Sequence, residues 1–268
     1  MSYSRIVGVR SPAARTDLTV VLDLDSCLLH TMPSGTTDLL TKIMTDPNLL
    51  EIRSRVYQMS IYDLGGKKGH GAAEKYWGVF RPHLLTFMMF LFSYCRTVCF
   101  WSAGQRDYVN ECVAKICRGM RTPYIVMNWD DIEELPDGGY HKPLSKVIAL
   151  DPENIKEDRI LLIDDRRQNG ISAPSSFILI PRYEPTPNTS ALMQDDIALL
   201  QIKQWLLSDA VTRARDIRMV DKSRIFLTSL APSPPARSQI YIEPRSAMWA
   251  NPLYLQSLPD DGLISVTI

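Results

Sequence analysis

Two pairs of aspartates carry the clearest chemical signal in the sequence: Asp23 and Asp25, and Asp164 and Asp165. The first pair closes the run LTVVLDL and the second directly follows RILLI, and both runs are typical of short buried strands. If the two strands lie in one sheet, their ends bring four carboxylates close together. Such carboxylates repel one another unless a cation neutralises them, and an all-oxygen ligand set favours Mg²⁺. The pattern therefore predicts a magnesium site at the ends of two strands.

Neither pair is decisive alone, because a single DxD or DD is more typical of a solvated turn or a helix cap. Two further residues extend the pattern: Ser102 follows a third hydrophobic run, and Lys142 lies between the two pairs in the chain. Ser102 could instead cap the helix that follows it, and Lys142 could be an ordinary surface lysine. The coincidence of all these residues in one chain favours a functional cluster.

Strand and helix signals alternate along most of the chain. The periodicity predicts strands over 18–24, 97–101, 124–128, 159–163 and 177–180, and helices over 82–94, 105–117, 144–150 and 191–215. Strands that alternate with helices indicate an α/β fold, with a Rossmann-like parallel sheet flanked by helices. Ligands bind such sheets at the carboxyl ends of the strands, which is where the aspartates fall.

A small β-hairpin insertion is expected after the first strand. A helical stretch over 38–53 is broken at Pro47, and two β-prone segments then span about 55–80 around the glycine-rich GGKKGHGAA. This glycine cluster lacks the GxxxxGK[ST] order of a phosphate-binding loop and predicts a hairpin tip. We expect a flexible arm over 1–16, one domain over 17–215, and a proline-rich extension over 216–268 that packs on the core.

Composition argues against several classes of protein. The 268 residues carry 30 basic and 30 acidic side chains, so no broad basic surface for nucleic acid is expected. Arg96 interrupts the apolar stretch that begins at 84, which is too short to span a membrane. Five cysteines without a CxxC pair or a secretory leader indicate reduced, buried thiols. We expect an intracellular protein that binds neither nucleic acid nor membrane; its oligomeric state stays open.

Together these motifs resemble the FCP/SCP-type, or NIF-like, phosphatases of the haloacid dehalogenase-like superfamily, which act on the carboxy-terminal domain of RNA polymerase II. The family's DLDxTLxH run matches Asp23 to His30, with Cys27 at the position of the threonine. The other matching segments are Arg81-Pro82-His83 (RPH), Phe100 to Gly104 with Tyr108 (FTAS), Tyr140-His141-Lys142 (the lysine loop) and Ile163-Asp164-Asp165 (the acidic pair). The resemblance covers about residues 17–210.

The resemblance implies a mechanism in two steps. Asp23 would attack phosphorus and form an aspartyl-phosphate, and Asp25 would protonate the leaving hydroxyl and then activate water. Mg²⁺ would be held by Asp23, the backbone carbonyl of Asp25, and Asp165, with Asp164 as a supporting neighbour. The implied substrate is phosphoserine or phosphothreonine in a protein.

The resemblance also implies how the substrate is held, and here the chain departs from the family. Ser102, in place of a threonine, and Lys142 would hold phosphate oxygens. Where the family carries a basic residue upstream of the lysine, this chain reads WDDIEE over 129–134, which would repel a phosphorylated polymerase peptide. This segment and Cys27 leave two alternatives: a small-molecule phosphatase that uses the same aspartates, and a non-catalytic binding protein that retains the fold.

Overall fold

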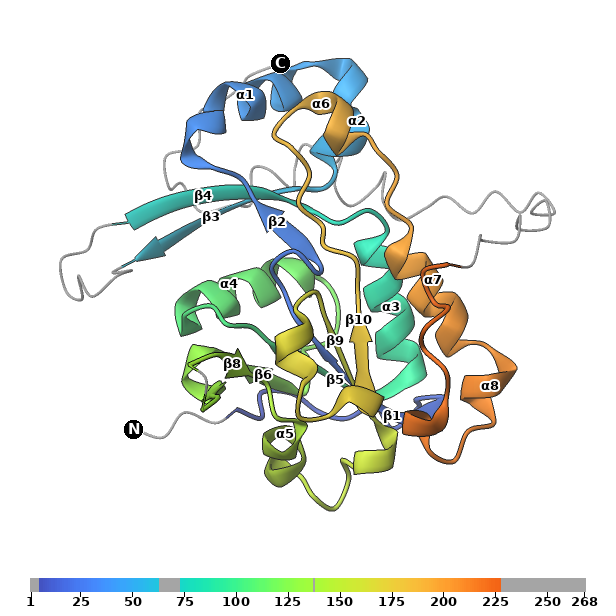
Figure 1. The fold of residues 1–268 in the computed structure, drawn as a ribbon. Coiled ribbons are helices and arrows are strands. Elements are labelled where there is room, and N and C mark those ends of the chain that lie inside the picture. Colours follow the sequence, from blue (N-terminus) through green and yellow to red (C-terminus); the bar gives the residue numbers. More distant parts are fainter. Residues whose placement is uncertain (1–4, 63–72, 137, 228–268) are drawn as a thin grey trace.

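A five-stranded parallel sheet forms the centre of the computed structural model, which describes residues 5–62, 73–136 and 138–227 (Figure 1). Its strands, in spatial order, are β10 (Phe177–Leu179), β9 (Ile160–Asp164), β1 (Thr16–Leu22), β5 (Cys95–Trp101) and β6 (Ile125–Met127). Each of the predicted strands is present within a few residues of its expected bounds. The parallel α/β sheet predicted from the sequence is confirmed.

The register of β1 with its two neighbours determines where the candidate residues lie. Leu22 is paired with Ile163 of β9 on one side and with Phe100 of β5 on the other. Because all three strands run in the same direction, the residues that follow them emerge at the same edge of the sheet. The loop after β1, the loop after β5 and the end of β9 therefore meet there.

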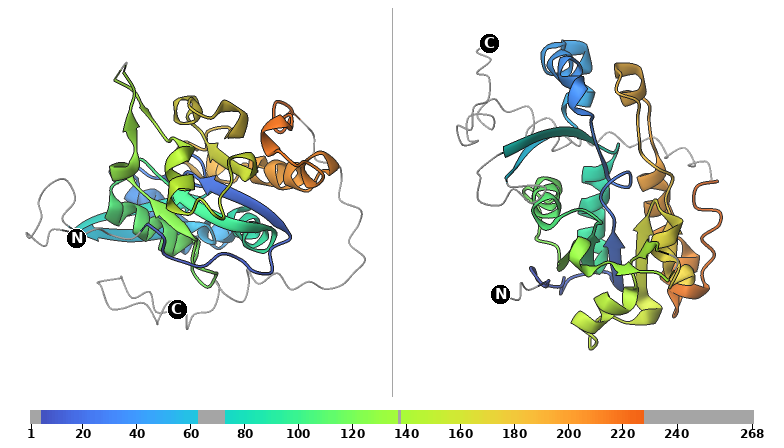
Figure 2. Two further views of the ribbon diagram at one scale, coloured as in Figure 1. Left: turned by 90° about the horizontal axis from the view of Figure 1, so that it is seen from below. Right: turned by 60° about the vertical axis from the view of Figure 1, so that its left-hand side comes forward.

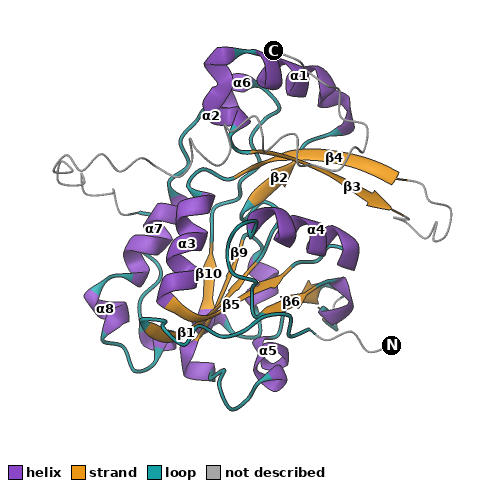
Figure 3. Ribbon diagram, turned by 180° about the vertical axis from the view of Figure 1, so that it is seen from behind, coloured by secondary structure: helices purple, strands orange, loops and turns teal. Residues whose placement is uncertain are grey.

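Helices cover both faces of the central sheet, as Figure 3 shows. On one face, alternate β1 side chains pack with α3 (Leu84–Tyr94), α4 (Arg106–Ile116) and α7 (Ala198–Leu206). On the other face, Val21 packs in a second cluster that includes residues of α5 (Leu144–Leu150). The buried β-branched run of β1 thus lies between two apolar layers, which holds its carboxyl end in a fixed position.

The insertion after β1 is a three-stranded antiparallel sheet in the order β2 (Leu29–Thr31), β4 (Ala73–Phe80), β3 (Val56–Tyr62). It lies on the side toward which the central strands point and passes over α4 (Figures 1 and 2). The predicted hairpin is confirmed as the β3–β4 pair, and β2 adds a strand that was not predicted. The expected glycine-rich tip lies in 63–72, outside the described residues.

A small helical layer covers the outer face of this insertion. It consists of α1 (Thr37–Thr45), α2 (Leu50–Arg53) and α6 (Thr189–Leu192), whose apolar residues pack around Trp77 and Val79 of β4. The predicted break at Pro47 is present, and the Asp46 side chain accepts a hydrogen bond from the Asn48 amide there. The insertion therefore has its own apolar core, separate from that of the central sheet.

The long helix predicted over 191–215 is wrong, because the structure divides this stretch into α6, α7 and α8 (Asp209–Thr212). Side-chain oxygens interrupt the helix: Asp196 accepts from the Ala198 amide, and Ser208 accepts from the Val211 amide. The helix predicted over 82–94 begins at Leu84, because His83 has a left-handed backbone with φ of 66°.

The two ends of the domain are partly described. Residues near the N-terminus run along the edge strand β6, where Ile6 forms an antiparallel bridge with Ile125. After α8 the chain continues to residue 227, with Ile217 and Ile225 buried in the main core. The rest of the expected extension, 228–268, lies outside the described residues. Among the described helices, none combines the length and apolarity needed to cross a bilayer.

Candidate active site

The two predicted strand ends converge. Asp23, Asp164 and Asp165 each offer a carboxylate oxygen, and these three oxygens lie within 4.8 Å of one another. The Asp23 amide donates a 3.0 Å hydrogen bond to the Ile163 carbonyl, which ties the end of β1 to the end of β9. All three aspartates are buried. The two strand ends therefore meet as expected, but three of the four expected carboxylates form the cluster, and Asp25 is not among them.

Lys142 enters this cluster from the short hairpin formed by β7 (Glu133–Glu134) and β8 (Tyr140–His141). Its ammonium donates to Asp23 Oδ1 at 2.5 Å and to Asp164 Oδ2 at 2.7 Å, and the side chain is completely buried. A surface role for Lys142 is thus excluded. A lysine has three N–H donors, so two are used here.

Asp164 is held by more donors than its neighbours are. Besides Lys142, it accepts from the Arg166 amide and from the Asn169 side chain, whose Nδ2 lies 2.9 Å and 2.8 Å from its two oxygens. The Asn169 carbonyl also accepts from the Lys142 amide at 3.1 Å. Asp164 and Asn169 therefore orient the lysine. The sequence analysis missed Asn169, because its only signal is a polar residue five positions after Asp164.

Asp25 lies in a tight turn after β1 and faces a different group of residues. The turn is closed by the Leu24 carbonyl, which accepts from the Leu28 amide at 2.8 Å, and Ser26 has a φ of 58°. The Asp25 carboxylate accepts from the Tyr108 hydroxyl on one oxygen and from the Ser102 hydroxyl, at 3.5 Å, on the other. Asp25 is thus close to Ser102 but outside the cluster of three aspartates.

Ser102 follows β5 and is buried with 1% of its surface exposed. Its hydroxyl oxygen accepts from the Gly104 amide at 3.0 Å, whereas α4 begins only at Arg106, with Gln105 before it. Ser102 therefore does not cap the helix. Its position next to Asp25 leaves its hydroxyl at the same edge of the sheet as the other predicted site residues.

Burial dominates the electrostatics of the cluster. It raises the pKa of Asp23 well above the ordinary value, and Asp164 raises it further while Lys142 opposes the shift. Burial alone would lower the pKa of Lys142, but Asp23 and Asp164 beside it raise that pKa above its ordinary value. The pKa of Asp25 is also raised, chiefly by burial, and the Tyr108 hydrogen bond limits the rise.

The residues fit a divalent cation. One oxygen of Asp165, Oδ2, is buried and accepts no hydrogen bond, although Arg182 Nε lies 2.8 Å away in an ion pair. If ionised, the three carboxylates, the Lys142 ammonium and the Arg182 guanidinium together carry a net charge of −1. The donors are all oxygens, which are the ligands that Mg²⁺ prefers. Because Asp164 already accepts four hydrogen bonds, Asp23 and Asp165 are the freer ligands.

The acidic segment upstream of Lys142 is largely neutralised. Asp130 pairs with Arg106 at 2.7 Å, Asp131 with Arg5 at 2.8 Å, and Glu133 with Lys146 at 3.1 Å. The expectation that 129–134 repels a phosphorylated peptide is weakened by these ion pairs, which the sequence could not reveal because their partners are distant in the chain.

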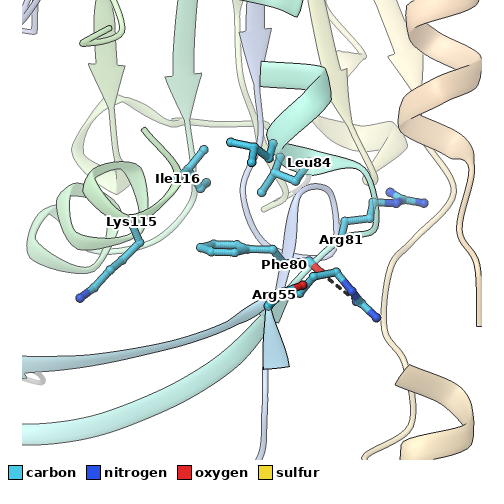
Figure 4. Close-up of a pocket in the computed structure, with 8 residues that line it drawn as sticks. Arg55, Phe80, Arg81, Leu84, Lys115 and Ile116 are labelled. Atoms are coloured by element: carbon cyan, nitrogen blue, oxygen red, sulfur yellow. Dashed lines mark hydrogen bonds between the residues drawn. The ribbon is translucent and has the colours of Figure 1, made fainter. Parts of the chain in front are cut away.

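A separate pocket of about 40 Å³ is lined by residues that include Arg55, Phe80, Arg81 and Lys115. Figure 4 shows these residues beside the strands of the insertion. Arg55 donates to the Phe80 carbonyl there at 3.1 Å. Arg81 is completely buried and donates to the Cys27 carbonyl and to Asp196. None of the predicted site residues lines this space, and Arg81 of the RPH segment instead ties the turn after β1 to Asp196 through the Cys27 carbonyl.

One known protein family matches most of this chain. The sequence profile of the NLI interacting factor-like phosphatases matches residues 18–218. Among solved structures, fission yeast RNA polymerase II CTD phosphatase Fcp1 bound to beryllium fluoride is 19% identical, with a TM-score of 0.48 over 62% of this chain and 42% of that chain. A second structure, described as Fcp1, an essential RNA polymerase II CTD phosphatase, is 19% identical, with a TM-score of 0.47 over 77% of this chain and 58% of that chain.

The chain thus spans about half the length of these two structures. A search of curated protein sequences found no match. Because the family profile covers most of the chain, from β1 to the segment after α8, the protein belongs to the NLI interacting factor-like phosphatase family.

Proposed function

We propose that this chain is a Mg²⁺-dependent phosphatase that removes phosphate from phosphoserine or phosphothreonine in proteins. One observation carries the proposal: the ammonium of the buried Lys142 donates to Asp23, at the point where the ends of β1 and β9 bring Asp165 close to Asp23. A nucleophilic carboxylate with a fixed cation and an acidic neighbour is what transfer of a phosphoryl group requires.

The reaction we propose has two steps. An oxygen of Asp23 attacks phosphorus while the bond to the serine or threonine oxygen breaks, and Asp25 gives its proton to that departing oxygen. Asp25, now a carboxylate, takes a proton from water, and the hydroxide attacks the phosphorus of the aspartyl-phosphate. Inorganic phosphate leaves, and Asp23 and the protonated Asp25 are restored.

Three residues would hold the phosphoryl group and its charge. The remaining N–H of Lys142 and the Ser102 hydroxyl would donate to phosphoryl oxygens, where negative charge is shared in the transition state. Asp23, Asp165 and the backbone carbonyl of Asp25 would hold Mg²⁺, which when bound lets the anionic carboxylate and phosphate approach each other. Asp164 would keep Lys142 in place.

A protein substrate is preferred to a small metabolite because a three-stranded insertion, rather than a full cap domain, lies over the strand ends. The carboxy-terminal domain of RNA polymerase II is the substrate that the family points to, and an intracellular location follows from that proposal. The ion pairs of Asp130, Asp131 and Glu133 remove most of the negative charge that argued against such a peptide.

The alternatives make different predictions. A small-molecule phosphatase would use the same aspartates but prefer sugar phosphates to phosphopeptides. A binding protein without activity would have no use for a buried lysine between two buried carboxylates, a group that is costly to desolvate.

The test is a phosphatase assay of wild type and Asp23→Asn on a panel of phosphopeptides and sugar phosphates, with Mg²⁺ and with excess chelator. We expect turnover of phosphoserine or phosphothreonine peptides by the wild type with Mg²⁺ alone, and none by Asp23→Asn, which should keep the wild-type circular dichroism spectrum. Activity in that variant, or undiminished rates in chelator, would contradict the proposal. A preference for sugar phosphates would select the first alternative, and no turnover at all the second.

A further inference from the structure

A chain of three hydroxyl groups leads to Asp25 from the insertion. The Tyr57 hydroxyl lies 2.9 Å from Thr31 Oγ1, and Thr31 Oγ1 lies 3.0 Å from the Tyr108 hydroxyl, which in turn donates to Asp25 Oδ1. These residues come from four parts of the fold: β3, β2, α4 and the turn after β1. They are separated by up to 83 positions in sequence, so only the tertiary fold brings them together.

When Asp25 is ionised, these three hydrogen bonds can have only one set of donors and acceptors. A carboxylate accepts only, so the Tyr108 hydrogen points to Asp25 and its oxygen is free to accept from Thr31. The Thr31 oxygen can then accept from Tyr57. Each bond polarises the next, which strengthens the bond that ends on the carboxylate.

The Asp25 carboxylate accepts a second side-chain hydrogen bond, from Ser102, which is weaker than the one from Tyr108. Ser102 donates to the other carboxylate oxygen at 3.5 Å. This is longer than the roughly 2.5–3.0 Å that is usual between two oxygens. Ser102 also has to serve the substrate in the proposed function. The bond from Tyr108 is therefore the better formed of the two side-chain hydrogen bonds to Asp25.

The strands of the insertion hold Tyr57, the hydroxyl group farthest from Asp25 in this series. Tyr57 is buried, with 4% of its surface exposed, and its ring stacks on Phe80 with centroids 4.9 Å apart. Opposite it, β4 carries Gly78, where a Cβ would lie 2.4 Å from the Tyr57 hydroxyl and 2.4 Å from the His30 carbonyl oxygen. The strand therefore leaves the space that the Tyr57 hydroxyl occupies.

We infer that Tyr108 is a positioning residue that aims the Asp25 carboxyl at the leaving oxygen of the substrate, and that Thr31 and Tyr57 hold Tyr108 for this purpose. The insertion then takes part in catalysis by setting the orientation of the general acid. This inference rests on the proposed function and adds to it a role for three residues outside the acidic cluster.

The consequence is a dependence on the leaving group. The alkoxide of serine needs a proton as it departs, whereas a nitrophenolate leaves without one. If the Asp25 carboxyl is no longer oriented toward the leaving oxygen, hydrolysis of a phosphoserine peptide should therefore slow more than hydrolysis of an aryl phosphate. The comparison is made on kcat/KM, which reports formation of the phosphoenzyme and not its later hydrolysis.

The experiment compares Tyr108→Phe with wild type on a phosphoserine peptide and on p-nitrophenyl phosphate. Tyr94→Phe is the matched control, because it removes a buried tyrosine hydroxyl that donates to the Leu206 carbonyl, away from the site. We expect Tyr108→Phe to lower kcat/KM for the peptide by about tenfold or more, which is part of the roughly 10²–10⁴-fold that general acid catalysis contributes. For p-nitrophenyl phosphate, kcat/KM should fall by less than about threefold. Tyr94→Phe should leave kcat/KM unchanged for both substrates.

Thr31→Val provides a second variant and should show the same selective loss, smaller than that of Tyr108→Phe. An equal loss on both esters, or a normal rate on the peptide, would overturn the inference while leaving the proposed function intact. A wild type that hydrolyses neither ester would instead overturn the proposed function, and the inference with it.

Discussion

At the scale of single residues, the site is a balance between buried charges. Lys142 is completely buried between Asp23 and Asp164, and each of these three groups is tolerated only because the others are present. The sequence located six of the candidate residues because hydrophobic runs precede most of them. It gave no role to Tyr108, and it missed Asn169 and Arg182, whose importance comes from contacts made across the fold.

Lys142→Met should be severely destabilising in the absence of metal. It removes the cation and leaves two buried carboxylates facing each other, which costs about 3–5 kcal/mol. The loss should shrink as the pH is lowered, because burial raises the pKa of Asp23 and its carboxylate then becomes protonated. Urea unfolding at about neutral pH and at about pH 5 measures both effects.

Lys146→Met is the control, since Lys146 is partly exposed and pairs with Glu133 at the surface. Its effect should stay within about 1 kcal/mol. A loss for Lys142→Met no larger than that of Lys146→Met would show that the buried ion pairs do not matter for stability.

At the scale of elements, the prediction succeeded where a segment is determined by its own hydrophobic pattern. The runs that became β1, β5 and β9 are buried almost throughout, so their strands could be read from composition alone. The strand β2 has three residues and exists because β4 pairs with it. The division of 191–215 depends on side-chain oxygens that accept from the backbone, which periodicity does not reveal.

The insertion offers a test of how closely its strands are packed. In Gly78→Ala the new Cβ would approach a backbone carbonyl and the Tyr57 hydroxyl at 2.4 Å, so the strands must separate or shift. We expect a loss of about 1–3 kcal/mol in the free energy of unfolding. Gly35→Ala is the matched control, because nothing lies within 4 Å of its added Cβ. Equal stabilities for the two variants, measured by chemical denaturation, would contradict this description of the insertion.

At the scale of the whole molecule, two sheets cooperate at one edge. The central sheet presents Asp23, Ser102 and the acidic pair at the ends of its strands, and the insertion lies over that edge and contacts Tyr108. The parallel sheet was predictable from the alternation of strands and helices. The way in which the insertion meets α4 was not, because no local pattern encodes a contact between Thr31 and a residue 77 positions away.

Binding of Mg²⁺ should stabilise the whole protein more at high pH than at low pH. Burial raises the pKa of Asp23 and of Asp165 above the ordinary value of an aspartate, so the folded protein keeps protons on these groups at a pH where the unfolded chain has lost them. The stability that protonation provides is therefore lost as the pH rises through these raised pKa values. At low pH the metal must displace these protons in order to bind, whereas at high pH the carboxylates are already ionised, so the metal binds more tightly.

Thermal unfolding with and without Mg²⁺, at about pH 5 and about pH 8, measures this difference. The rise in Tm should be larger at the higher pH, and Asp165→Ala should abolish most of it. A shift in Tm that is independent of pH, or that survives in Asp165→Ala, would place the bound metal elsewhere.

The central claim is that Asp23 is phosphorylated during turnover, and trapping of that intermediate tests it most directly. Asp25→Asn removes the group that activates water, so a phosphoenzyme formed from an aryl phosphate should accumulate. After an acid quench, mass spectrometry of the peptide that contains Asp23 should show one added phosphoryl group that hydroxylamine removes, and Asp23→Asn should show none. An unmodified Asp23 in an enzyme that continues to release phosphate, or a phosphoryl group on another residue, would contradict the account.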